Sequence, residues 1–249
     1  MKRMNIIKFL RVGGIALATG YFSMFSGFAQ AGDIAGSVHD FSDGVYADTS
    51  TYTWNTNNEL CTVCHTPHAA DTTVSVAPLW DRTLTTTTYD LYDTSTTFDG
   101  VATIAQPNGI SKLCLSCHDG SIALDSFGGV VGTGDTVNDM NGGSRNIGED
   151  DGAGNGFLNN DHPVSFEYTE DTVDPGMFAS TTGGITIGSG ARTKTGTLAE
   201  MMLTNDAGTL TVECTSCHDV HNNYVGTDGT RLLKVNLTGS ALCLTCHNK

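Results

Sequence analysis

Eight cysteines constrain this chain more than any other feature of its sequence. They form four C-x-x-C pairs with none left over, and a histidine follows each pair directly. We call each C-x-x-C-H unit a clamp and number the clamps one to four along the chain. The cysteines are Cys61/Cys64, Cys114/Cys117, Cys214/Cys217 and Cys243/Cys246, and the histidines that follow them are His65, His118, His218 and His247. Such repetition indicates one chemistry that the chain uses four times.

The clamp is the signature of covalent c-type haem attachment. Two thiols three positions apart add to the two vinyl groups on one edge of the porphyrin, and the adjacent histidine ligates the iron from one face. Disulfides of exported proteins and zinc ribbons also use C-x-x-C pairs, but neither requires a histidine at the next position. The sequence therefore predicts four covalently attached haem c groups, each with one proximal histidine on its iron.

Four further histidines remain, one for the open face of each predicted iron. They are His39, His68, His162 and His221. This count predicts bis-histidine coordination at all four haems. Methionine is the rival ligand, and four methionines follow residue 31, namely Met140, Met177, Met201 and Met202. Met201 and Met202 are adjacent, so they cannot easily serve irons that lie well apart.

Two of the clamps continue into a second histidine, as His65-x-x-His68 and His218-x-x-His221. Residues three apart in a helical turn project from the same side. The second histidine therefore cannot easily reach the far face of the iron that the first one holds, and it must ligate a different iron. Each such segment brings two haems close together. We expect His221 to serve the fourth haem, His68 the second, and His162 the first or third.

Residues 1–31 have the features of a secretory signal peptide. Basic residues open the segment, an apolar run extends to about residue 28, and Ala29-Gln30-Ala31 has the pattern of a cleavage site. The apolar run is short and broken by glycine for a transmembrane helix, although an uncleaved membrane anchor stays open as the alternative. Export agrees with the attachment of c-type haem outside the cytoplasm.

The chain is acidic, with a formal net charge of −15. Four of its basic residues lie in the expected signal peptide, so the mature chain is more acidic still. This charge argues against nucleic acid and against an anionic membrane surface as partners. It suits a secreted protein that is extracellular or at the cell surface, with the periplasm as the alternative location.

The composition predicts the fold class. Gly, Thr, Asn and Asp crowd the chain, and we find no long stretch with the apolar period of a helix. We expect one tetrahaem domain over 32–249, mostly coil with short α-helices and little β structure, around a stacked four-haem array. Its halves are 32–125 and 160–249, and 128–160 is a loop. Short helices are expected over 111–118, 198–204 and 240–247, with short strands possible near 184–188 and 209–213.

These motifs resemble a known family. Four C-x-x-C-H clamps, the C-H-x-x-H extension, the D-H-P-V-S-F segment at 161–166 and a clamp at the C-terminus resemble the extracellular multihaem c-type cytochromes of metal-reducing bacteria. Within these, the chain is similar to the tetrahaem filament formers, the OmcE-like cytochrome nanowires, over essentially the whole mature chain. The resemblance implies a head-to-tail homopolymer with stacked haems, in which a histidine of one protomer ligates a haem of the next. It gives that role to His39, toward haem three or four of its neighbour, whereas the residues alone leave open whether His39 serves its own chain or a neighbour.

Three functions remain open from the sequence. The first is extracellular electron transfer along a haem filament, in which the haems carry the electron and no side chain is catalytic. The second is a discrete soluble tetrahaem shuttle, periplasmic or secreted, that docks on other redox proteins. The third is a multihaem reductase, which needs an iron with an open sixth position. We expect no enzyme activity, because every predicted iron has a candidate second histidine.

Overall fold

All eight histidines and all eight cysteines lie in the residues that the structure describes. The computed structural model describes residues 34–44, 51–72, 79–92, 104–132, 146–148, 155–169, 176–227 and 231–248. The expected signal peptide and Met140 lie outside these ranges. Ala31–Lys249 makes up one compact unit.

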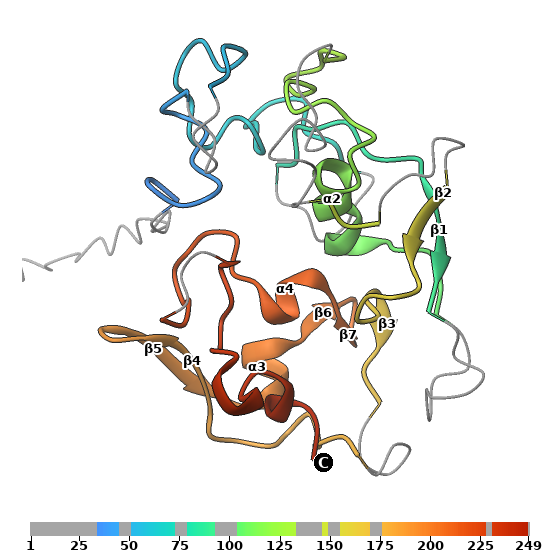
Figure 1. Ribbon diagram of the computed structural model, residues 1–249, viewed down its shortest axis with the longest axis vertical. Helices are drawn as coiled ribbons and strands as arrows, with labels where there is room; N and C mark the ends of the chain where they lie inside the picture. The colour runs from blue at the N-terminus through green and yellow to red at the C-terminus, as the bar shows by residue number, and fades with distance from the viewer. Residues whose placement is uncertain are drawn as a thin grey trace, which may run out of the picture. The chain divides into compact units, whose positions relative to one another are not determined.

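Helices form chiefly at the clamps. The structure has α2 at Gly109–His118, α3 at Leu198–Met202 and α4 at Cys214–Cys217, followed by the 3-10 turns η4 at Thr238–Ser240 and η5 at Cys243–Thr245 (Figure 1). The helices expected over 111–118 and 198–204 are confirmed. The expected helix over 240–247 is instead the 3-10 turn η5, preceded by η4, inside which Gly239, with φ 62°, leaves the helical region.

The expectation of little β structure is wrong. In the described residues, seven strands form three small sheets. The strands are β1 Thr88–Leu91, β2 Asn155–Leu158, β3 Phe166–Glu167, β4 Ile185–Ser189, β5 Arg192–Gly196, β6 Thr204–Asp206 and β7 Thr209–Val212. The sheet orders are β1-β2, β3-β7-β6 and β4-β5. The strands near 184–188 and 209–213 are confirmed as β4 and β7, but their partners were not expected.

Two-residue turns explain the missed partners. Between β6 and β7, Ala207 and Gly208 both have positive φ, at 50° and 97°, which is the requirement of a type I′ hairpin turn. Between β4 and β5, Gly190 takes φ 57° at the first of two loop positions, which suits a type II′ turn. Each turn folds a threonine-containing segment back on its neighbour, and the backbone groups then pair within the hairpin.

The segment 128–160, expected as a loop, contains a strand. β2 pairs in parallel with β1, with Thr88 opposite Asn155 and Leu91 opposite Leu158. This pairing buries Tyr89 and Leu158 against Leu115 of α2. A threonine-rich stretch that reads as coil thus becomes a strand because a distant segment supplies its partner, and such long-range pairing has no local signal.

Three separate side-chain clusters make up the core in the described residues. The largest joins β3, β4, α3 and β7, and holds Phe166, Tyr168, Ile187, Leu198, Met201, Met202 and Val212. Met177 packs against it. The second contains Tyr52 and Leu124, and the third contains Tyr89, Leu115 and Leu158. The clusters reach the clamps, since Cys246 packs against the first and Cys117 against the second.

In the ranges that the structure describes, no helix is both long enough and apolar enough to cross a membrane.

Candidate functional site

All four clamps share one local conformation, a single helical turn. In clamps one, three and four, the histidine N–H donates to the carbonyl of the first cysteine, at 2.9 Å for His65, 3.0 Å for His218 and 3.0 Å for His247. Clamp two occupies the last turns of α2. Positions i, i+3 and i+4 of a helical turn lie on one face. The turn therefore presents both thiols and the histidine of each clamp to the same side, as attachment to one ligand requires.

The clamps lie next to one another in the order of the sequence. Burial first, and then the charge of Cys117, raises the pKa of Cys64 to about 11, so clamps one and two are neighbours. A hydrogen bond between Cys114 and Cys214 is the largest influence on both thiols, raising the pKa of Cys114 and lowering that of Cys214.

Clamps three and four are neighbours as well. Burial first, and then the charges of Cys217 and Cys243, raises the pKa of Cys246 to about 12. All eight thiols are free. The four attachment points thus form a continuous row, one to two to three to four.

Six of the eight histidines face one another in pairs that combine distant parts of the chain. The ring centroids are 6.0 Å apart for His39 and His118, 6.2 Å for His65 and His221, and 6.4 Å for His162 and His247. Each pair joins the histidine of one clamp to a histidine outside that clamp. A pattern of one proximal and one distal histidine therefore arises three times.

The separation within each pair fits a shared metal ion. Bonds from a metal to an imidazole nitrogen are about 2.0–2.1 Å long. An imidazole nitrogen lies about 1.1 Å from the centre of its ring, given ring bonds of about 1.33 Å. Two rings on opposite sides of one iron therefore have centroids about 6.3 Å apart by this geometry. The observed separations of 6.0–6.4 Å agree with this value. They also lie within the roughly 4.5–7 Å of aromatic rings in ordinary contact, so the spacing is compatible with an ion between the rings and does not by itself require one.

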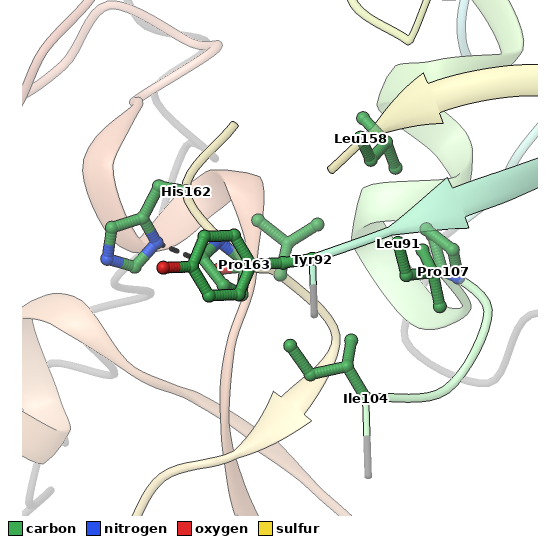
Figure 2. A pocket seen from close by; sticks show the side chains of 8 residues that line it. Leu91, Tyr92, Ile104, Pro107, Leu158, His162 and Pro163 are labelled. Atoms are coloured by element: carbon green, nitrogen blue, oxygen red, sulfur yellow. Dashed lines mark hydrogen bonds between the residues drawn. The ribbon is translucent and has the colours of Figure 1, made fainter. Parts of the chain in front are cut away.

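The ring nitrogens have the hydrogen bonds expected of axial ligands. Nδ1 of His218 is 2.7 Å from the carbonyl of Arg231, and Nδ1 of His162 is 2.9 Å from that of Pro163. Metal-binding histidines usually donate one ring N–H to such a carbonyl, which fixes the ring and leaves the other nitrogen for the metal. His162 lies at one side of a shallow apolar hollow near the end of β1, lined by Leu91, Tyr92, Ile104, Pro107, Leu158, Pro163 and Val164 (Figure 2).

His39 lies among the other histidines of its own chain. Burial is the main cause that lowers its pKa to about 4, and His118, His218 and His221 lower it further. Its Nδ1 is buried and has no hydrogen-bond partner in the described residues. This position argues against the expectation that His39 ligates a haem of a neighbouring copy, because His118 of the same chain already faces it.

The other expected pairings also change. His221 faces His65 of clamp one and not clamp four, and His162 faces His247 of clamp four and not clamp one or three. The expected assignments relied on nearness along the sequence, whereas the pairs form between segments that the fold brings together. His218 and His221 have different neighbours, since His221 faces His65 and His218 lies at the carbonyl of Arg231.

His68 and His218 remain outside the three pairs. Both side chains are exposed. The backbone N–H of His68 donates to Oγ1 of Thr66, and His218 is held at Arg231. In the part of the chain that the structure describes, neither ring contacts another aromatic ring. His39, and not His68, is the histidine that lies opposite His118 of clamp two.

The methionines have other roles. Met201 and Met202 are buried in the largest side-chain cluster, and Met177 packs against it. Their thioethers therefore contribute to the core, which leaves histidine as the better-placed axial ligand in the described residues.

Buried charged residues next to the clamps were missed by the sequence analysis. Asp119 follows His118 and is fully buried, and it accepts hydrogen bonds from Tyr89 Oη at 2.7 Å and Ser121 Oγ at 2.7 Å. Glu213 precedes Cys214 and accepts from Ser165 Oγ at 3.0 Å and from Ser111. Adjacency to a clamp could have drawn attention to both, because a charge beside a haem changes its properties.

Arg82 is the buried cation of this region. It is 3% exposed, and its guanidinium donates to the carbonyls of Val63, inside clamp one, and Ala123, just after α2, at 3.1 and 3.2 Å. Its Nε has no partner in the described residues. Arg82 therefore connects the segments of clamps one and two, and no sequence pattern marks it.

A comparison with protein-family models finds no match for this chain, and a search of curated proteins finds none either.

Proposed function

We propose that this protein is an exported electron-transfer protein that carries four covalently attached haem c groups with histidine axial ligands. The observation that carries the proposal is the set of three histidine pairs that join distant segments of this one chain, each with a ring separation that fits one iron. The haem, when bound, supplies a one-electron ferric/ferrous couple. The two cysteines of each clamp would hold the porphyrin by thioether bonds, and in three of the four cases two imidazoles of the chain would ligate its iron.

The row of neighbouring clamps supports transfer from haem to haem. Cys64 lies near Cys117, Cys114 hydrogen-bonds Cys214, and Cys217 lies near Cys246. Porphyrins attached at these points lie close together, so an electron can pass along the row without another carrier. No described side chain is needed as an acid, base or nucleophile for this function.

We further propose that copies of the chain polymerise head to tail at the secreted or cell-surface location expected from the sequence. His218 would hold an iron that no other histidine of its own chain faces, and His68 is an exposed histidine outside the pairs. His68 of one copy can complete the coordination at His218 of the next. One such bond per junction joins the haem rows of successive copies into a nanowire.

Two variants test this arrangement. His68→Ala should abolish filaments in electron micrographs of the haem-staining extracellular fraction, while the spin state of the single chain stays unchanged. His39→Ala should leave filaments intact and make one additional haem high-spin. Filaments formed by His68→Ala would contradict the junction. Single particles formed by the wild type would favour the discrete shuttle.

The unpaired His218 also supports a second candidate, a multihaem reductase with a reactive iron at clamp three. Such an enzyme needs an exchangeable sixth position. In that case the native assembled protein keeps a high-spin signal that nitrite or hydroxylamine perturbs. Four low-spin haems in the assembled protein would exclude it.

A further inference from the structure

A turn at the surface carries the two histidines of the His218-x-x-His221 segment. The carboxylate of Asp219, directly after His218, accepts three backbone N–H groups of this turn. The distances are 3.1 Å from His221, 2.9 Å from Asn223 and 2.7 Å from Tyr224. Two of these bonds share Oδ2 and the third uses Oδ1, so both oxygens are engaged.

The backbone around Asp219 anchors this turn to the neighbouring segment. The N–H of Asp219 donates to the carbonyl of Leu232 at 2.8 Å, and His218 forms an antiparallel bridge with Leu233. Beyond Asp219, Asn222 takes a positive φ of 55°. A non-glycine residue adopts this region at a cost, so other interactions must hold the turn in place. The carboxylate of Asp219 supplies them.

The turn determines where the two histidines point. His218 is held at the carbonyl of Arg231, whereas the ring of His221 faces His65 from clamp one, nearly parallel to it at 20°. The N–H of His221 is itself one of the groups bound by Asp219. The carboxylate thus acts directly on the backbone that carries this ring.

We propose that Asp219 is the positioning residue that holds His221 as the second axial ligand of the iron at His65. This inference rests on the proposed function, because the ligand role of His221 does. A ligand on a fixed backbone binds without the entropy loss of ordering a loop. Removal of the carboxylate leaves three N–H groups without their acceptor, and the turn then opens to water.

Other aspartates next to candidate ligands make a useful comparison. Asp40 follows His39 and binds the N–H groups of Gly36 and Ser42, but no N–H of a histidine. Asp161 precedes His162, and its carboxylate accepts no hydrogen bond from the described residues. Among these residues, Asp219 is distinguished because its carboxylate binds the backbone of a second candidate ligand.

The test compares carbon monoxide binding to the dithionite-reduced holoproteins in the same assembly state, together with their haem content. Asp219→Ala should bind one more carbon monoxide per chain than the wild type, because the iron at His65 loses a ligand. His221→Ala should give the same increase and the same spectrum. Added imidazole should restore the low-spin spectrum of the Asp219→Ala protein. Asp161→Ala is the matched control and should equal the wild type.

Asp219→Asn is a milder second variant, which keeps the inference testable if Asp219→Ala does not fold. The amide has one acceptor oxygen and cannot engage both sides of the turn, so carbon monoxide binding should rise by part of one equivalent. No increase in either Asp219 variant, at full haem content, would overturn the inference and leave the electron-transfer proposal intact. A wild-type protein without haem would instead defeat the proposed function.

Discussion

Under the proposed function, Arg82 would influence a haem that it does not ligate. It is buried, and its positive charge opposes the effects that raise the pKa of the neighbouring Cys64. Ferric haem carries one more positive charge than ferrous haem, so a buried cation nearby favours the ferrous form. The effect is large at this position because the low dielectric of the interior screens it weakly.

We therefore expect Arg82→Gln to lower the reduction potential of the haem at clamp one or clamp two. A spectroelectrochemical titration of the holoprotein measures this, and Arg192→Gln, at an exposed position, is the control. Arg82→Lys keeps the charge and should keep the potential while it loses one of the two carbonyl contacts. A titration curve of Arg82→Gln that overlays the wild type would contradict this role.

At the scale of single residues, the sequence predicts the chemistry of the clamps from their residue types. The structure places the two thiols and the histidine of each clamp on one helical turn, which is compatible with that prediction. The partner of each remaining histidine depends on contacts between distant segments, such as His65 with His221. Spacing along a chain carries no such information, and for that reason the histidine pairs of the structure differ from those expected from the sequence.

Helix α3 depends on a capping box at its first turn. Thr197 accepts a hydrogen bond from the N–H of Glu200, and the Glu200 carboxylate accepts from the N–H of Thr197 at 2.8 Å. The helix carries Leu198, Met201 and Met202 into the largest cluster. We expect Thr197→Ala to lower the free energy of unfolding by about 1 kcal/mol, measured by urea denaturation. Thr193→Ala, at an exposed position in β5, should change it far less.

The capping box also predicts a pH dependence. The backbone and side-chain hydrogen bonds of Thr197 lower the pKa of Glu200. A carboxylate with a lowered pKa in the folded state stabilises the protein above its unfolded pKa, and this contribution is lost as the pH falls below the usual glutamate range. Glu200→Gln should therefore reduce the acid sensitivity of unfolding below about pH 4.5. An unchanged pH profile would show that the box does not form in solution.

Two of the glycines in the β4–β5 hairpin separate two physical effects. Gly188 has φ 84°, and a Cβ there would lie 2.0 Å from the carbonyl oxygen of Arg192, whereas Gly190 has φ 57° and open space around it. Gly190→Ala should cost roughly 1–2 kcal/mol from the left-handed conformation alone. Gly188→Ala should cost clearly more because the clash adds to it. Equal costs in thermal unfolding would contradict this geometry.

At the scale of elements, local signals predicted some parts and missed others. Helix α2 and strands β4 and β7 follow patterns that a short window contains. Strands β5 and β6 could have been found from the Gly-Ala and Ala-Gly turns next to them. The β1–β2 pair could not, since its two segments are far apart in sequence and neither alternates clearly.

The whole molecule should contain four haems and lack residues 1–31 when it is isolated from the medium. Intact mass spectrometry and the pyridine haemochrome assay measure both.

Replacement of Cys114 and Cys117 by Ala should remove one haem and slow electron exchange between the two halves, because clamp two lies between clamps one and three. Replacement of Cys243 and Cys246, at the end of the row, should leave exchange among the first three haems unchanged.

The histidine pairs have a further consequence for the unfolded chain. Each pair joins segments that lie far apart in the sequence, so an iron bound to both closes a long loop. Loop closure removes entropy from the unfolded state, as a disulfide does. The fold then needs no large apolar core, in agreement with its three separate side-chain clusters. A small competing ligand that displaces one histidine would therefore act as a denaturant and loosen the molecule well beyond the iron that it binds.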